Sequence, residues 1–209
     1  MNDTDRYYEL LQQLEAARSQ GRYPQALALS LEALQCLPAL VRWCIKEVGR
    51  WDIPAVPPIA YACQYLAALQ RRDEIERVRA LIASIPQLSD WLEEIDGAFE
   101  GADLMSRVEQ HLRQHPGSLQ KNMGRELGVD GRDVSNLLLY ARQIGVIRRE
   151  AEGKTYRLYF QESPLATANL HGIHPVSGAQ QSSTGSRPSG CAIAFLVVLA
   201  NGLQGILGK

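Results

Sequence analysis

The chain of 209 residues has few of the side chains that build metal centres and disulfide frameworks. It contains four histidines and four cysteines, and none of the cysteines, at positions 36, 44, 63 and 191, forms a Cys-x-x-Cys pair. We therefore expect neither a structural zinc site nor a disulfide framework. The N-terminal stretch MNDTDRYYELL lacks a basic segment followed by an apolar run, so we expect no signal peptide and a reducing, cytoplasmic setting.

The motifs of common enzymes are also missing. The sequence has no Gly-rich phosphate loop ending in Lys-Ser/Thr, no H-E-x-x-H and no G-x-S-x-G. His111 and His115 lie four residues apart, but no third ligand follows at a suitable spacing, so we expect no metal. We expect a protein that is not an enzyme, with no catalytic residues and no cofactor.

The net charge of −1 hides an uneven distribution along the chain. Residues 1–101 carry ten Lys/Arg against fifteen Asp/Glu, whereas residues 102–160 carry ten against seven. Residues 161–209 hold only Arg187, Lys209 and Glu162. This pattern predicts an acidic front module, a basic middle module and a nearly uncharged tail.

The front module, residues 1–100, shows the periodicity of amphipathic helices. Apolar residues predict helices over 5–19 and 24–36, with Pro38 ending the second. Gly21, Tyr23, Ala26, Ala33, Leu34 and Pro38 form the pattern G-x-Y-x-x-A, then A-L, then P. This pattern resembles the second half of a tetratricopeptide repeat, in which small Ala residues let two helices approach and Tyr fills the gap at the turn.

The later part of the front module predicts more helices without a regular second repeat. They are expected near 40–48 and over 59–70, 73–84 and 88–99. Residues 1–100 are therefore either a TPR-like helical array or a non-repetitive helical bundle. In either form we expect this module to bind a protein partner or to self-associate.

The middle module, residues 102–160, follows a short acidic, Gly-containing segment at 96–103. Its pattern predicts helices over 103–115, 118–129 and 131–145, a strand beginning at Val146, a turn at 152–154 and a strand over 155–160. Residues 119–160 resemble the winged helix-turn-helix superfamily, including the run Ile144-Gly145-Val146-Ile147-Arg148-Arg149. The expected fold is mainly α: a TPR-like array followed by a winged helix of three helices and a β-hairpin.

The resemblance implies a DNA-binding transcriptional regulator whose partner is duplex DNA. In a helix-turn-helix the second helix enters the major groove, which here is 131–144. The base contacts expected from this helix are Arg132, Ser135, Asn136 and Tyr140. The phosphate contacts expected from the preceding helix and the wing are Lys121, Asn122, Arg125, Arg148, Arg149, Lys154 and Arg157. DNA binding would require Arg132, Arg148, Arg149 and Lys154 on one continuous face.

Two other functions remain open at this point. Winged helices also serve as protein-interaction modules, and a helical array followed by a winged helix resembles scaffold subunits of the proteasome lid and of translation initiation complexes. The acidic residues near the expected surface would repel phosphate; they are Asp130, Asp133, Glu150 and Glu152. The alternative is a non-catalytic assembly scaffold, or a membrane-tethered adaptor, whose winged helix binds protein.

The tail divides into a polar and an apolar part. Residues 161–190 contain six Ser, four Gly and three Pro, a composition that predicts a disordered linker. In the apolar tail, 191–209, an apolar run reaches from 191 to 208 with two amide interruptions. Its 18 residues approach the roughly 17–25 residues that a membrane-spanning helix needs. We expect 191–208 to associate with a membrane, to pack on a partner or on the helical array, or to stay unstructured.

Overall fold

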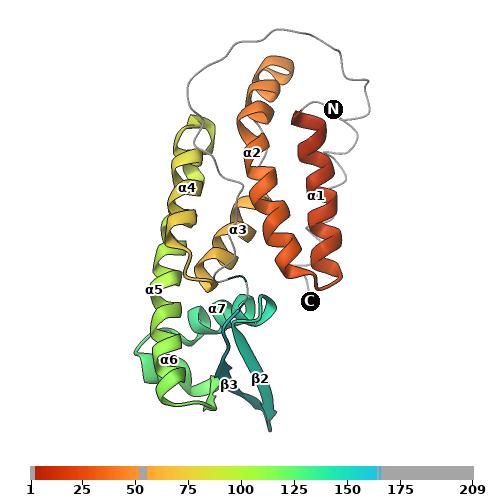
Figure 1. The fold of residues 1–209 in the computed structure, drawn as a ribbon. Helices are drawn as coiled ribbons and strands as arrows, with labels where there is room; N and C mark the ends of the chain where they lie inside the picture. Colours follow the sequence, from red (N-terminus) through yellow and green to blue (C-terminus); the bar gives the residue numbers. More distant parts are fainter. Residues whose placement is uncertain (1–2, 52–55, 164, 166–209) are drawn as a thin grey trace. The chain divides into compact units, whose positions relative to one another are not determined.

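The computed structural model describes residues 3–51, 56–163 and 165, and in these residues the chain is mainly helical (Figure 1). The expected apolar tail and all but the first few residues of the expected linker lie outside the described residues. The elements, in chain order, are α1 Asp3–Ser19, α2 Tyr23–Val48, α3 Pro57–Ala68, α4 Arg72–Ala83, the 3-10 helix η1 Pro86–Trp91, α5 Leu92–Gln114, β1 Ser118–Leu119, α6 Gln120–Leu127, α7 Gly131–Gln143, β2 Ile147–Glu152 and β3 Thr155–Phe160.

The first two helices form an antiparallel pair, as the sequence predicts for 5–19 and 24–36 (Figure 1). Gly21 joins them with φ of +70°, a conformation that glycine adopts without steric cost. Half-buried Tyr23 lies at this turn, with a ring carbon 3.9 Å from the position that a Cβ atom at Gly21 would take. The centroid of its ring lies 6.4 Å from that of Tyr65 in α3.

Helix α2 does not end at Pro38, which corrects the expected helix stop. Proline in a helix interior costs about 3 kcal/mol because it removes a hydrogen bond and crowds the preceding turn. Beyond it, Leu40, Val41 and Cys44 are all buried, and each buried leucine or valine contributes roughly 1.5–3 kcal/mol. Burial of the following turns therefore outweighs the cost of Pro38, and the helix continues to Gly49.

Helix α2 is also long and apolar enough to cross a bilayer when judged by length and composition alone. In the structure, 56% of its apolar stretch is buried inside the protein. Core helices of soluble proteins pass the same test, so this helix is weak evidence for a membrane location.

Helix α5 runs unbroken through 96–103, where the sequence predicts a separating segment. Ala98 and Ala102 are buried, and α5 packs along α3. A Cβ atom added at Gly101 would lie 3.2 Å from the Cβ of Ala67. The small residues therefore serve close packing of two helices, and the expected boundary between the modules falls inside α5.

A three-stranded antiparallel sheet of order β1-β3-β2 completes the described chain. The hairpin pairs Ile147 with Phe160 and Glu152 with Thr155, in agreement with the predicted strands and turn. The short strand β1 was not predicted, and it pairs Ser118 with Leu158. Helices α5 and α6 contact β3, while α7 contacts β2.

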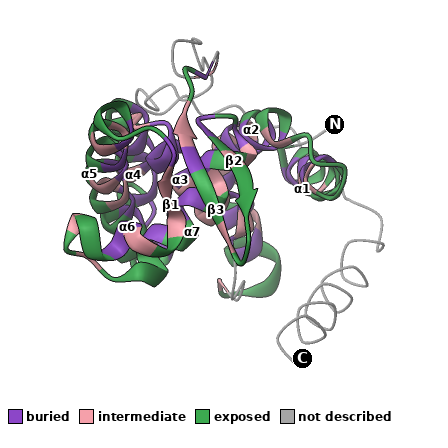
Figure 2. Cartoon of the chain, turned by 90° about the horizontal axis from the view of Figure 1, so that it is seen from below, coloured by how far each residue is buried: buried purple, intermediate pink, exposed green. Residues whose placement is uncertain are grey.

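The front helices and the C-terminal helices belong to one compact unit. Helix α3, eight of whose twelve residues are buried, contacts both α5 and α7 (Figure 2). The unit includes the start of the expected linker. Buried Ser163 donates a hydrogen bond to the carbonyl of Ile144 at 2.9 Å, and Leu165 packs against the core.

Candidate nucleic-acid interface

Helices α6 and α7 are joined by a three-residue turn that depends on glycine. Gly128 ends α6 with φ of +66°, and the side chain of Asp130 caps α7 by accepting a hydrogen bond from the Arg132 backbone N–H at 2.6 Å. A Cβ atom at Gly124 would lie 2.9 Å from the Cα of Gly131 and 3.0 Å from the carbonyl oxygen of Val129. Both neighbours are backbone atoms, so only glycine lets the two helices meet this closely.

Helix α7 presents three different faces. Its buried face consists of Val134, Leu137, Leu138 and Ala141. The ring of half-buried Tyr140 packs edge-on against Tyr65 of α3, with centroids 5.6 Å apart. The exposed face repeats at helical spacing and consists of Arg132, Ser135, Asn136, Leu139 and Arg142.

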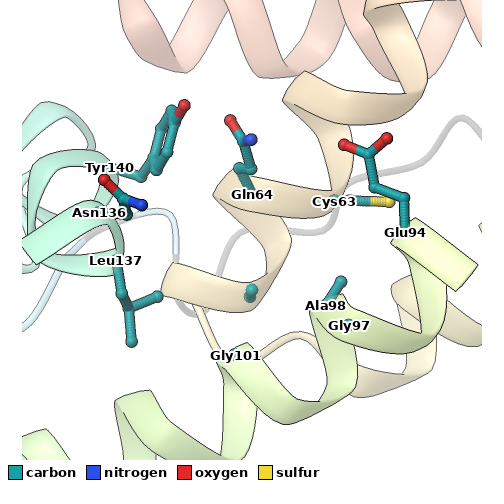
Figure 3. A pocket seen from close by; sticks show the side chains of 10 residues that line it. Cys63, Gln64, Glu94, Gly97, Ala98, Gly101, Asn136, Leu137 and Tyr140 are labelled. Atoms are coloured by element: carbon teal, nitrogen blue, oxygen red, sulfur yellow. The ribbon is translucent and has the colours of Figure 1, made fainter. Parts of the chain in front are cut away.

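The four expected base contacts are therefore not equivalent. Arg132 and Ser135 lie on the exposed face of α7. Tyr140 is directed toward α3, and Asn136 shares a pocket with it between α3, α5 and α7 (Figure 3). Arg132, Ser135 and Asn136 are thus available to a partner that approaches the exposed face of α7, whereas Tyr140 is not.

The expected phosphate contacts of the hairpin are divided between its two faces. Side chains alternate along a strand, so Arg148 and Arg149 lie on opposite faces of β2. Arg148 forms an ion pair with Glu150, and Arg157 pairs with Glu152 at 2.9 Å. Arg132, Arg148, Arg149 and Lys154 therefore do not form the single continuous face that the sequence-based hypothesis requires.

Arg149 of β2 is half-buried, and the charge of a second arginine, Arg142 of α7, acts on it. Its Nε and Nη2 atoms are covered and have no hydrogen-bond partner in the described structure. Burial lowers the pKa of Arg149, and the charge of Arg142 lowers it further, while Tyr156 lies under its guanidinium at 5.6 Å. Arg142 was not among the expected contacts, although its position ten residues after Arg132 places it on the same helix face.

Two lysines from separate segments meet at the hairpin turn. Lys121 and Lys154 line an open hollow of about 420 Å³ together with Glu152, Gly153 and Thr155. The backbone N–H of Lys121 donates to the Thr155 hydroxyl at 3.3 Å, which fixes the start of α6 against the hairpin.

Basic residues without an acidic partner, among those the structure describes, cluster in this part of the chain. Arg125 is exposed one helical turn after Lys121, and Asn122 is half-buried between them. Six side chains of α6, α7 and the hairpin have no ion pair with a described residue: Lys121, Arg125, Arg132, Arg142, Arg149 and Lys154. The exposed acids Asp130 and Asp133 lie at the start of α7, beside Arg132.

His111 and Cys63 are the side chains to consider for metal binding and redox chemistry. His111 contacts the Ser118 hydroxyl and the Glu126 carboxylate, both at 3.1 Å. In the described ranges, no three His, Cys, Asp or Glu side chains gather as metal ligands would. Cys63 is buried, and burial raises the pKa of its thiol to about 12. A thiol with this pKa is protonated at neutral pH and is a poor nucleophile.

Comparisons of the chain with models of protein families, with curated protein sequences and with solved structures found no match.

Proposed function

We propose that α6 and α7 form the helix-turn-helix of a winged helix, with β2 and β3 as its wing, and that this unit binds duplex DNA. The order of elements and the short, glycine-dependent turn between the helices support this assignment. For the front helices we propose a protein-interaction or dimerisation module. The α1–α2 pair supports a TPR-like unit, whereas the continuation of α2 through Pro38 departs from that pattern.

The half-buried guanidinium of Arg149, on which the charge of Arg142 acts, carries the proposal. Like charges repel each other, and covered guanidinium nitrogens without partners lose the hydrogen bonds they make in water. A protein that folds in this way gains stability from an anion that approaches these arginines. A nucleic-acid phosphate supplies such an anion, and arginine is well suited to bind it through several N–H donors.

The structure leads to a different set of contacts from the one the sequence alone suggests. We assign base reading to Arg132 and Ser135, which occupy the first turns of the exposed face of α7. The phosphate contacts are Lys121, Arg125, Arg142, Arg149 and Lys154. Arg148 and Arg157 are left out because each is already paired with a glutamate.

The salt dependence of DNA binding tests this assignment. The full-length chain is titrated against a labelled random-sequence duplex at several salt concentrations, and fluorescence anisotropy gives the dissociation constant. The double variant Arg142→Gln/Arg149→Gln should lower the slope of log affinity against log salt by about two, because each lost phosphate contact contributes roughly 0.9. The matched control Arg148→Gln/Arg157→Gln removes the same charge and should change the slope little. Equal effects of both variants, or no binding at low salt, would overturn the proposal.

One observation favours a second candidate function, a scaffold whose wing docks on protein. The Arg148–Glu150 and Arg157–Glu152 pairs make one face of the hairpin nearly neutral, and Arg148 lies over the ring of Tyr159 at 4.5 Å. A neutral face with an aromatic ring is more typical of a protein contact than of a phosphate contact. This function becomes the better one if the duplex does not bind at low salt.

A further inference from the structure

A pocket of about 230 Å³ lies where α3, α5 and α7 meet (Figure 3). Its floor is built from small residues of α3 and α5: Cys63, Ala67, Gly97, Ala98 and Gly101. Gly97 has open space where a side chain would be, since nothing lies within 4 Å of a Cβ atom built there. The pocket therefore exists because side chains are missing from the helices that line it.

Glu94 is the one charged residue among those that line the pocket. Glu94 of α5 contributes a carboxylate that has no ion pair with a described residue. The side-chain oxygen of Gln64 in α3 is fully covered and has no hydrogen-bond partner among the described residues. Burial raises the pKa of Glu94, which shows that the environment stabilises its negative charge poorly. The Glu94 carboxylate would therefore gain from a hydrogen-bond donor that carries positive charge.

The opposite end of the pocket belongs to α7. Leu137 and Tyr140 supply apolar and aromatic surface there, and Asn136 adds an amide at the exposed edge (Figure 3). A cavity of about 150 Å³ holds a benzene molecule, so this pocket has room for an aromatic ring with a short side chain. Its dimensions and chemistry match a small molecule with one apolar end and one cationic end.

We propose that this pocket binds a small primary amine with an aromatic or aliphatic body. The ammonium group lies at the Glu94 carboxylate, and the body lies on the glycine and alanine floor toward Leu137 and Tyr140. The amine competes with water for this carboxylate, while its body buries apolar surface.

The same pocket offers a route to regulation, which rests on the proposed function. The ligand contacts α7 through Asn136, at the exposed edge of the pocket, and through Tyr140. If α7 adopts two positions and the amine binds one of them more tightly, amine binding shifts the population of molecules toward that position. The affinity for DNA then changes when the two positions differ in how tightly they bind DNA. Binding of the amine itself does not depend on DNA.

Calorimetry on the full-length chain without DNA tests the binding site. The probes are phenethylamine, its neutral analogue phenethyl alcohol and its anionic analogue phenylacetate. We expect saturable binding of the amine and at least about tenfold weaker binding of the other two, since a charge-assisted hydrogen bond is lost in each. Binding of all three with equal affinity, or no saturable binding of the amine at millimolar concentration, would overturn the proposal.

Three variants locate the site. Glu94→Gln keeps the shape of the side chain and should weaken phenethylamine binding at least about tenfold without affecting the alcohol. Glu93→Gln, an exposed neighbour outside the pocket, should change neither. Gly97→Leu should block all probes, and its open surroundings leave the fold intact. Amine binding that survives both Glu94→Gln and Gly97→Leu would place the ligand elsewhere and refute the assignment.

A separate titration with DNA shows whether the bound amine changes the affinity for DNA. If the affinity for DNA does not change, the calorimetric result on amine binding still stands.

Discussion

Tyr140 of α7 packs edge-on against Tyr65 of α3, with ring centroids 5.6 Å apart and ring planes at 85°. Tyr65 is fully buried, and its hydroxyl donates a hydrogen bond to the Gln143 side chain at 3.2 Å. These contacts join the front helices to the helix that we assign to DNA. We therefore expect the front helices and α7 to be coupled energetically.

A double-mutant cycle measures this coupling. Tyr65→Leu and Tyr140→Leu should each destabilise the protein, and the double variant should lose less than the sum of the two. The expected interaction free energy is about 0.5–1.5 kcal/mol, the range for edge-to-face aromatic pairs. Urea denaturation should show one cooperative transition for the described unit. A coupling of zero, with separate transitions for front and C-terminal helices, would mean that the two parts fold independently.

The turn between α6 and α7 provides a second prediction. Gly124→Ala should destabilise the protein by about 1–3 kcal/mol, because the new methyl group meets backbone atoms that have no room to move. Gly131→Ala is the matched control, since a Cβ atom there has nothing within 4 Å. Thermal denaturation measures the stability of both variants. Equal stability of Gly124→Ala and Gly131→Ala would mean that the backbone does not pass close to Gly124.

Local signals explain why the elements of the C-terminal half could be predicted from the sequence. Asp130 is a good N-cap, and Gly128 and Gly145 adopt the positive φ values that end helices. These signals depend on neighbours within a few residues. They place the helix and strand boundaries without knowledge of the rest of the fold.

The errors come from interactions between distant segments. Pro38 favours a helix end locally, but burial of the residues after it keeps α2 helical. The small residues of 96–103 look like a separating segment until α3 is placed against them. The direction of Tyr140 toward α3, and the proximity of Arg142 to Arg149, likewise depend on packing that the periodicity of one helix does not contain.

Base reading by α7 is the third prediction. Arg132→Ala should cost about 1–3 kcal/mol of binding free energy on a preferred site and should relax the sequence preference there. Tyr140→Phe should leave both properties unchanged, because Tyr140 is directed toward α3. Selection of bound duplexes from a random pool, followed by anisotropy on the selected site, measures both effects. A change of preference in Tyr140→Phe with none in Arg132→Ala would reverse the assignment.

The half-buried Arg149 should lower the folding stability of the protein while it raises the affinity for DNA. Arg149→Met keeps an unbranched, apolar stem and removes a half-buried guanidinium with two covered nitrogens that lack partners in the described structure. The variant should be as stable as the original chain or more stable by up to about 1 kcal/mol, while its affinity for DNA falls. Arg148→Met, which removes an exposed and paired arginine, should not stabilise the protein. A loss of stability in Arg149→Met would show that the arginine has a structural role.

The last prediction concerns the ion pair between Arg71 and buried Glu74 in α4. The hydrogen bond from Arg71 holds the pKa of Glu74 below its ordinary value of about 4.3. The unfolded chain therefore binds a proton at this residue more readily than the folded chain does. The stabilisation is complete above pH of about 4.3 and is lost as the pH falls through the lower pKa of the folded state.

Glu74→Gln should therefore lower the free energy of unfolding at neutral pH by about 1–3 kcal/mol. The difference between the variant and the original chain should shrink as the pH falls below about 4, because the original chain then loses the same charge by protonation. Glu32→Gln is the control, since its pair with Arg6 is exposed and salt screens it. Urea denaturation across the acid range provides the measurement. A difference between Glu74→Gln and the original chain that stays constant down to the lowest pH would mean that the charge of Glu74 contributes nothing and that only its shape matters.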